Sequence, residues 1–316
     1  MAARKRIALE NDGQAILATF LKDQIRAGLP TLLEKGPQEL EQAARRMTDA
    51  QLKGVAVRLK KFAMQPFENT DAWYESALAL FAELFLLESA MRHPDHLPES
   101  VRQDIGTLMG RTITKKQLMA QPDADLVQDV WCAAATFEWS EPDHIRGRKQ
   151  WLYGLYTGRT AFILDYAHER MDLPPLACTP ATPTPGVLVF YPASFPQRAL
   201  LMPEVQPVVP RTPWYPPLAH WAAVQEQYAI ALSQYPWLEE MLCHVAGVTL
   251  FSHEKTWYLA DAAGKMMPLK APMTERTIWQ ILAITGGHPV PCLLLYTHAS
   301  VVPLGILQGQ QYLPFT

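Results

Sequence analysis

The sequence has few cysteines, and no two of them are close enough to act together. Its 316 residues contain four, Cys132, Cys178, Cys243 and Cys292, with no CxC or CxxC pair. This spacing excludes a zinc ribbon and a redox dithiol. It predicts a reduced, cytoplasmic chain in which each thiol serves as a small buried hydrophobe.

The chain also lacks a membrane segment and a strong excess of charge. Its densest apolar stretch, residues 77–87, is interrupted by Glu83 and is about half as long as the ~20 residues of a bilayer span. Polar residues 11–14 stand where a signal peptide would be apolar. Lys and Arg number 28 against 31 Asp and Glu, a net charge of -3. This balance argues against nucleic-acid binding over the whole surface and leaves a local patch open.

Local catalytic signatures are missing as well. The sequence contains no GxSxG, HExxH, Walker or GxGxxG motif, so we predict no catalytic residue, cofactor or metal. His93 and His96 have a spacing that suits a metal on a helix, but Pro94 between them favours a surface turn. Cys243 and His244 are adjacent; on a helix they would point about 100° apart and could not form a nucleophile–base pair.

The first ~130 residues have the apolar spacing of helices. The expected helices cover residues 16–25, 37–62, 71–91 and 98–108, with a short fifth one from Thr114. Gly28 and Pro30 end the first of them. Residues 71–91 are apolar nearly all round, which is typical of the buried centre of a bundle.

From Val130 the apolar period changes toward two, which indicates strands. The turn Thr157-Gly158-Arg159 predicts a hairpin of residues 151–156 and 160–166. Further strands are expected at residues 187–191, 245–251, 256–259, 291–296 and 301–307, and helices at 219–234 and 274–284. Of the 44 residues 174–217, 13 are proline, so we expect an extended connector with one strand. The prediction is an α+β fold: a helical bundle domain, residues 1–128, followed by a mixed, β-rich domain with antiparallel strands, residues 129–316.

Charge is unevenly distributed along the chain. Residues 1–65 hold 12 basic and 7 acidic residues (+5), and the remaining residues hold 16 and 24 (-8). A solvated helix face explains this more simply than an acidic partner does. A nucleic-acid-associated protein that uses these basic helices remains an alternative.

Two further sets of residues are candidate sites. Glu138, Asp165 and His168 belong to acidic–aromatic clusters and would supply acid–base chemistry if the chain were a hydrolase. Aromatic residues beside the proline-rich connector are typical of a protein-binding groove, although rings that clamp the connector onto its own domain explain them as well. If a binding surface exists, we predict it at Tyr191, Arg198, Trp214 and Tyr215.

Several motifs, taken in order, resemble one bacterial family. They are RRMTDAQLKGVAVRL (45–59), WLYG (151–154), GRTAFILDYA (158–167), LVFYP (188–192) with PQRAL (196–200), LADAAG (259–264) and TGGHP (285–289). Together, over about residues 15–310, they are similar to the region downstream of the finger in bacterial SWIM zinc finger family proteins. The finger itself, a CxC followed by CxH, is absent, so the chain is expected to be a fragment or a finger-less relative.

The resemblance carries expectations about function. Zinc and nucleic-acid binding belong to the missing finger and do not carry over, and the family has no established catalytic residues in this region. Family genes tend to lie beside genes for MoxR-type AAA+ ATPases and von Willebrand factor A proteins. We therefore expect a non-enzymatic protein-interaction or scaffold module, an adaptor and accessory subunit of such an assembly.

Overall fold

The chain divides into two compact units. The computed structural model describes residues 2–141, 144–202, 215–270, 274–308 and 311–315, with side chains from residue 12 onward. The units are Met1–Thr114 and Lys115–Thr316. This division precedes the expected boundary between residues 128 and 129, because α7 (Lys115–Met119) and the start of β1 (Leu126–Glu141) belong to the second unit.

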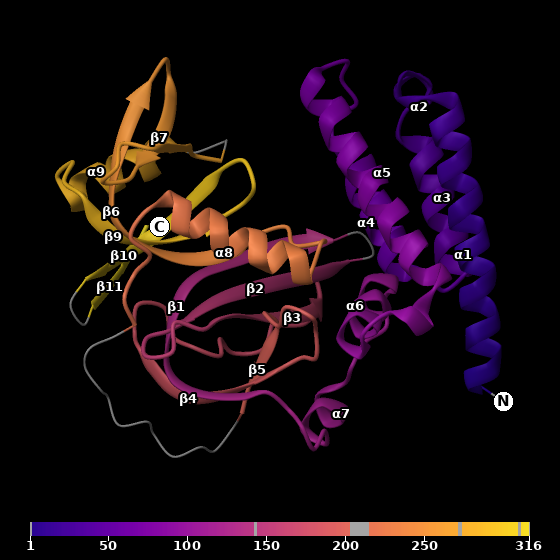
Figure 1. Cartoon of the computed structure of the whole chain (residues 1–316), viewed down its shortest axis with the longest axis horizontal. Helices are drawn as coiled ribbons and strands as arrows, with labels where there is room; N and C mark the ends of the chain where they lie inside the picture. The colour runs from indigo at the N-terminus through magenta and orange to yellow at the C-terminus, as the bar shows by residue number, and fades with distance from the viewer. Residues whose placement is uncertain (1, 142–143, 203–214, 271–273, 309–310, 316) are drawn as a thin grey trace. The chain divides into compact units, whose positions relative to one another are not determined.

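The first unit is a helical bundle (Figure 1). Its elements are α1 (Ala2–Ala27), α2 (Leu29–Lys35), α3 (Pro37–Asp49), α4 (Lys53–Ala63), α5 (Asp71–Arg92), the 3-10 turn η1 (Pro94–His96) and α6 (Glu99–Met109). Their apolar stripes meet in a core in which Leu17, Leu40, Met47 and Leu59 have no exposed surface. The predicted bundle is confirmed.

One expected helix is divided in two. Residues 37–62 were predicted as a single helix, but α3 and α4 are separated at Gln51, which has a left-handed φ of 64°. The Leu52 amide donates to the Met47 carbonyl at 2.8 Å and the Gln51 amide to the Thr48 carbonyl at 3.1 Å. These two bonds form a Schellman motif, in which glycine normally occupies the left-handed position. Because glutamine stands there instead, the sequence gives no helix-stop signal.

The second unit contains two antiparallel sheets (Figure 1). The first has the order β3-β2-β1-β4-β5, with β2 (Ile145–Gly154), β3 (Thr160–His168), β4 (Thr184–Phe190) and β5 (Ala199–Leu201). The second has the order β11-β10-β9-β6-β7-β8, with β6 (Met241–His253), β7 (Thr256–Ala260), β8 (Met266–Pro268), β9 (Val290–Tyr296), β10 (Val301–Gln308) and β11 (Gln311–Pro314). A bundle followed by a β-rich region of antiparallel sheets confirms the α+β prediction.

Consecutive side chains of β6 point to opposite faces of the second sheet, so each face packs against its own hydrophobic core. Leu242 packs with Trp151 of β2 in a cluster that the two sheets share. Cys243 and Val245 point to the opposite face, where α8 (Trp221–Gln234) and α9 (Glu275–Thr285) pack. All four cysteines are free and buried, as expected; burial raises the pKa of the Cys178 thiol to about 11.

The proline-rich segment is more regular than expected. It contributes β4 and β5, where the sequence predicted a single strand. The Phe190 amide faces β1, so by alternation the nitrogen of Pro185 faces the β5 side of the strand. The pairing of β4 with β5 begins only at Leu188, so the missing N–H of Pro185 costs no hydrogen bond between strands. Just before β5, the Gln197 carbonyl accepts a hydrogen bond from the Phe162 amide of the edge strand β3 at 2.7 Å. The first sheet is therefore curled until its two edges touch.

Across the described parts of the chain, no helix combines the length and the apolar character that a bilayer crossing requires.

The close crossing of α4 and α6 generates a stability prediction. A Cβ at Gly54 would collide with the Leu108 carbonyl oxygen and lie 3.0 Å from the Gly110 amide nitrogen. Because backbone atoms cannot yield as a side chain does, Gly54→Ala should lower the unfolding free energy by about 1–3 kcal/mol. Urea unfolding followed by circular dichroism measures this.

Gly106→Ala in α6 is the matched control. Its Cβ would meet only the flexible Arg111 side chain, at 3.2 Å, so the higher helix propensity of alanine should leave stability equal or up to about 1 kcal/mol greater. Equal losses in the two variants would contradict the importance of the crossing.

Candidate functional site

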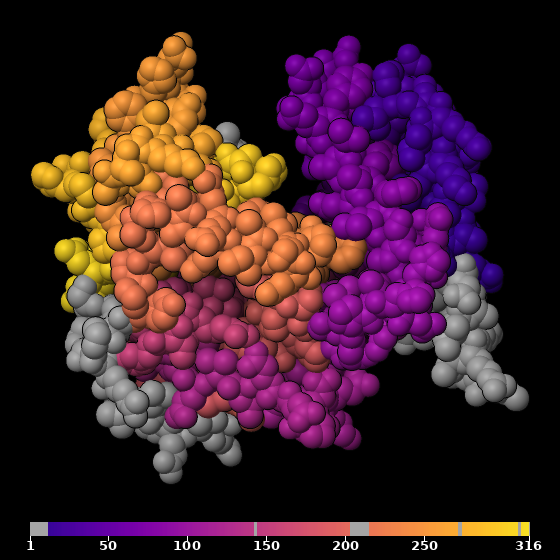
Figure 2. Space-filling model, in the orientation of Figure 1, coloured from indigo at the N-terminus to yellow at the C-terminus, as the bar shows by residue number. Residues whose placement is uncertain are grey.

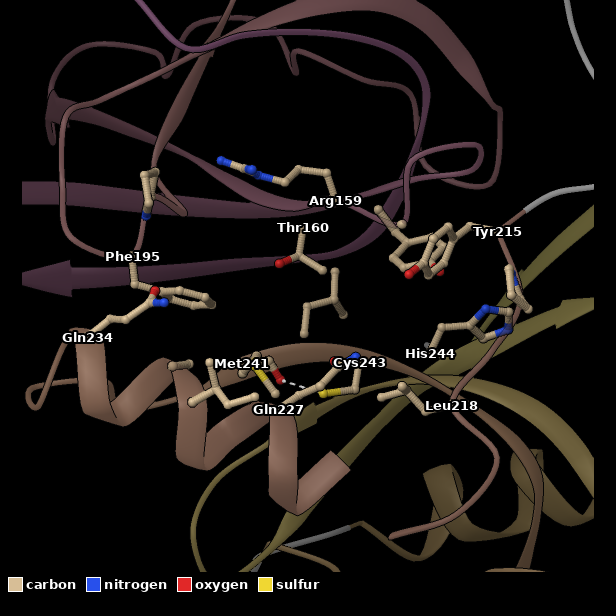
Figure 3. A pocket seen from close by; sticks show the side chains of 17 residues that line it. Arg159, Thr160, Phe195, Tyr215, Leu218, Gln227, Gln234, Met241, Cys243 and His244 are labelled. Atoms are coloured by element: carbon tan, nitrogen blue, oxygen red, sulfur yellow. Dashed lines mark hydrogen bonds between the residues drawn. The ribbon is translucent and has the colours of Figure 1, made fainter. Parts of the chain in front are cut away.

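A cavity of about 380 Å³ lies within the second unit (Figure 3). Its walls come from the β2–β3 hairpin, the loop between β4 and β5, residues 215–218, α8 and β6. Segments distant in sequence therefore form one concave site, of a volume within the ~300–1,000 Å³ range of small-molecule sites.

The hairpin wall is fixed by a buried carboxylate. Asp129 of β1 has no exposed surface, and it accepts hydrogen bonds from the Tyr156 and Thr157 amides at 3.1 and 2.9 Å. The Thr157 hydroxyl donates to it at 2.5 Å. Gly158 follows with φ 67°, and the Tyr215 ring occupies the space that its Cβ would fill. These contacts set the turn from which Arg159 reaches the cavity.

Residues 215–218 connect the two sheets beside the cavity. The Tyr215 amide donates to the Leu155 carbonyl, after β2, at 2.7 Å. Leu218 exchanges two hydrogen bonds of 2.8 Å with β6, donating to the His244 carbonyl and accepting from the Ala246 amide. The segment is therefore held at both ends by backbone bonds.

α8 forms the wall opposite the hairpin, and Figure 2 shows it at the surface of its unit. Its first amide, that of Trp221, donates to the buried Asp261 carboxylate at 2.9 Å. Gln227, Ile230 and Gln234 recur at spacings of three and four, so they share the side of the helix that lines the cavity. All three are exposed, which places α8 at the mouth.

His244 is the most unusual residue in the cavity wall. Its side chain lies at the same end of the cavity as Tyr215, with Leu218 beside it (Figure 3). It is only 7% exposed, and neither ring nitrogen has a hydrogen-bond partner. Its ring contacts that of Tyr153 edge-on, with centroids 5.4 Å apart. Burial lowers its pKa from 6.5 to about 4, so the imidazole is neutral near pH 7.

Three of the four predicted binding residues lie within the described part of the chain. The guanidinium carbon of Arg198 lies 4.4 Å from the centre of the Tyr191 ring, and the Tyr191 amide donates to the Arg198 carbonyl at 2.8 Å. Tyr215 lines the cavity, whereas this stacked pair lies outside its lining. Trp214 falls outside the described residues.

The acidic residues weighed for a hydrolase pair with arginines. Asp165 binds Arg148 at 2.7 Å, and Glu138 lies 3.5 Å from Arg146. Neither carboxylate, nor His168, lines the cavity. Within the described ranges no group of three His, Cys, Asp or Glu side chains is arranged to hold a metal.

Sequence reasoning missed His244 because it placed the residue wrongly. The sequence suggests a helix for Cys243 and His244, but they are consecutive residues of the strand β6, so their side chains alternate across the sheet even though both residues line the cavity. The available signal was a histidine within the strand-like run from Leu242 to Val245.

A second candidate surface lies on the bundle. Residues 71–91 were expected to be buried all round, but only one face of α5 is buried. On the other face Leu78 and Phe85 are 63% and 52% exposed. Phe85 also lines a shallow hollow with Ile25 of α1, which is 67% exposed. At the same hollow Arg92 donates two hydrogen bonds to the buried Glu88 carboxylate, at 2.7 and 2.8 Å.

The buried imidazole generates a pH prediction. The unfolded chain takes up a proton at His244 near pH 6.5 and the folded chain only near pH 4, so stability present above pH 6.5 is lost as the pH falls toward 4. Between pH 7 and 4.5 this residue should lower the unfolding free energy by roughly 2–3 kcal/mol. Urea unfolding of the native chain and His244→Phe measures it; parallel pH profiles for the two proteins would refute it.

Comparison with known proteins identifies the helical unit. Residues 5–109 match the model of the SWIM-associated four-helix bundle domain. No curated protein and no solved structure matches the chain. The match extends from within α1 to the end of α6, so the resemblance drawn from residues 151–289 stays a prediction. Over residues 5–109 the match confirms the resemblance to the region downstream of the finger in SWIM zinc finger proteins.

Proposed function

We propose that the protein is a non-enzymatic interaction module that works as an accessory subunit, or scaffold, with a MoxR-type AAA+ ATPase and a von Willebrand factor A protein. The observation that carries this proposal is the apolar, exposed face of α5. The choice of partners rests on the family resemblance. We also propose that the protein is cytoplasmic, because its four cysteines are buried and form no disulfide.

The α5 face has the composition of a protein-contact surface. Leu78 and Phe85 lie two turns apart on the same side of the helix, so a partner can cover both at once. Burying such side chains contributes about 1.5–3 kcal/mol each. A helix that keeps apolar residues in water gains nothing from them in the isolated chain, which supports a contact made elsewhere.

The hollow between α1 and α5 adds an anchor point to this face. Phe85 and Ile25 border it with apolar surface, and Arg92 stands at the same place with a guanidinium that is 43% exposed. An apolar centre with a polar rim is the usual anatomy of a protein interface. The hollow can take the tip of an apolar side chain of the partner, with a carboxylate beside it facing Arg92.

A double substitution on α5 tests the proposal. Leu78→Ser with Phe85→Ser removes the exposed apolar surface without touching the core, so each partner should bind at least about tenfold more weakly. Biolayer interferometry with the immobilised full chain, and with the MoxR-type ATPase and the von Willebrand factor A protein encoded in the same genome, measures the affinities.

Val57→Ser is the matched control, because Val57 is an apolar residue on α4 that is 52% exposed. It should leave both affinities within about twofold. Absence of binding to either protein, or equal losses in the two variants, would contradict the proposal. Steeply salt-dependent binding to duplex DNA without protein binding would favour the nucleic-acid alternative instead.

A further inference from the structure

We propose that the cavity between α8 and the β2–β3 hairpin binds a small, neutral organic molecule that carries a planar ring and a hydrogen-bonding group, with His244 as its buried polar partner. This site is separate from the α5 face and does not depend on it.

His244 supplies the first argument. A buried imidazole is ordinarily hydrogen-bonded, because a buried polar group without a partner loses the hydrogen bonds it makes with water. Here both nitrogens lack a partner while the ring lines the cavity. The neutral ring offers one donor and one acceptor, so a ligand hydroxyl or amide can satisfy it.

The same end of the cavity offers a route to those nitrogens. They are shielded from solvent in the structure, and Tyr215 lies at that end (Figure 3). Its backbone is fixed by the bond to Leu155, but its side chain is 44% exposed. Ligand binding at His244 therefore requires a side-chain rearrangement, such as rotation of the phenol ring from its place over Gly158.

The walls define the chemical class of the ligand. Tyr153, Phe195 and Tyr215 contribute aromatic rings, which favour a planar partner through stacked or edge contacts. Arg159 is the one formally charged side chain in the described lining, and its charge is met by Asp125 at 2.6 Å. With no charge left to offer, the site favours a neutral molecule over an ion.

Polar groups nearer the mouth complete the site. Gln227 and Gln234 of α8 and the Thr160 hydroxyl lie on the lining. They can bind a second polar group of the ligand, so the cavity combines a deep, neutral hydrogen-bonding end with a polar entrance. This arrangement of a few polar groups within apolar walls is typical of small-molecule sites.

The test uses three probes of nearly equal size: 4-hydroxybenzamide, which is neutral, 4-hydroxybenzoate and 4-hydroxybenzylamine. Saturation-transfer NMR and titration calorimetry on the full chain at pH 7 should show saturable binding of the amide, with both charged probes at least about tenfold weaker. No saturable binding of the amide up to about 10 mM, or tighter binding of either charged probe, overturns the proposal.

Variants localise the site. His244→Phe keeps the ring but removes the hydrogen bonds and should weaken amide binding at least about tenfold. Gln227→Trp should block the cavity, whereas Glu226→Trp, on an exposed neighbour outside the lining, should bind as the native chain does. Binding that survives both His244→Phe and Gln227→Trp, or that is lost equally in Glu226→Trp, overturns the assignment. Circular dichroism of each variant checks the fold.

Discussion

The buried carboxylate of Asp129 is the interaction on which the second unit most depends. It holds the hairpin turn through the Tyr156 and Thr157 amides, and that turn presents the Leu155 carbonyl and the open space above Gly158 to Tyr215. Residues 215–218 are hydrogen-bonded to Leu155 at one end and to β6 at the other. The carboxylate that fixes the turn therefore also helps to position the segment that links the two sheets. An unpaired acceptor at this depth would be costly, so the hydrogen bonds and the turn require each other.

The two candidate surfaces differ in physical character. The face of α5 is apolar and exposed and carries only a shallow hollow, so it has the character of a surface that another macromolecule would cover. The cavity is concave, and its polar groups converge from a helix, a hairpin and a strand, so it suits a ligand smaller than a protein. Each surface lies within a single unit, so each is complete without any particular arrangement of the two.

The helices and most strands could be predicted because apolar periodicity is a local property of the sequence. Glycine at the end of α9 and threonine at the start of α5 follow the same local rules, since Gly286 adopts the left-handed cap and the Thr70 side chain accepts from the Trp73 amide. The break at Gln51 was missed because a left-handed glutamine has no distinctive signal. The cavity was missed for a different reason: the Tyr215 and His244 side chains meet only through tertiary pairing, which periodicity does not encode.

The curled first sheet has a consequence for the addition of a further strand at its edge. An exposed strand edge invites another chain to add itself through backbone hydrogen bonds. In this sheet the amide of Phe162 already uses such a bond with Gln197, so at this position the edge is occupied by the protein's own loop. A strand added at Phe162 would first have to displace that loop, so the closure of the sheet opposes edge-to-edge association at this point.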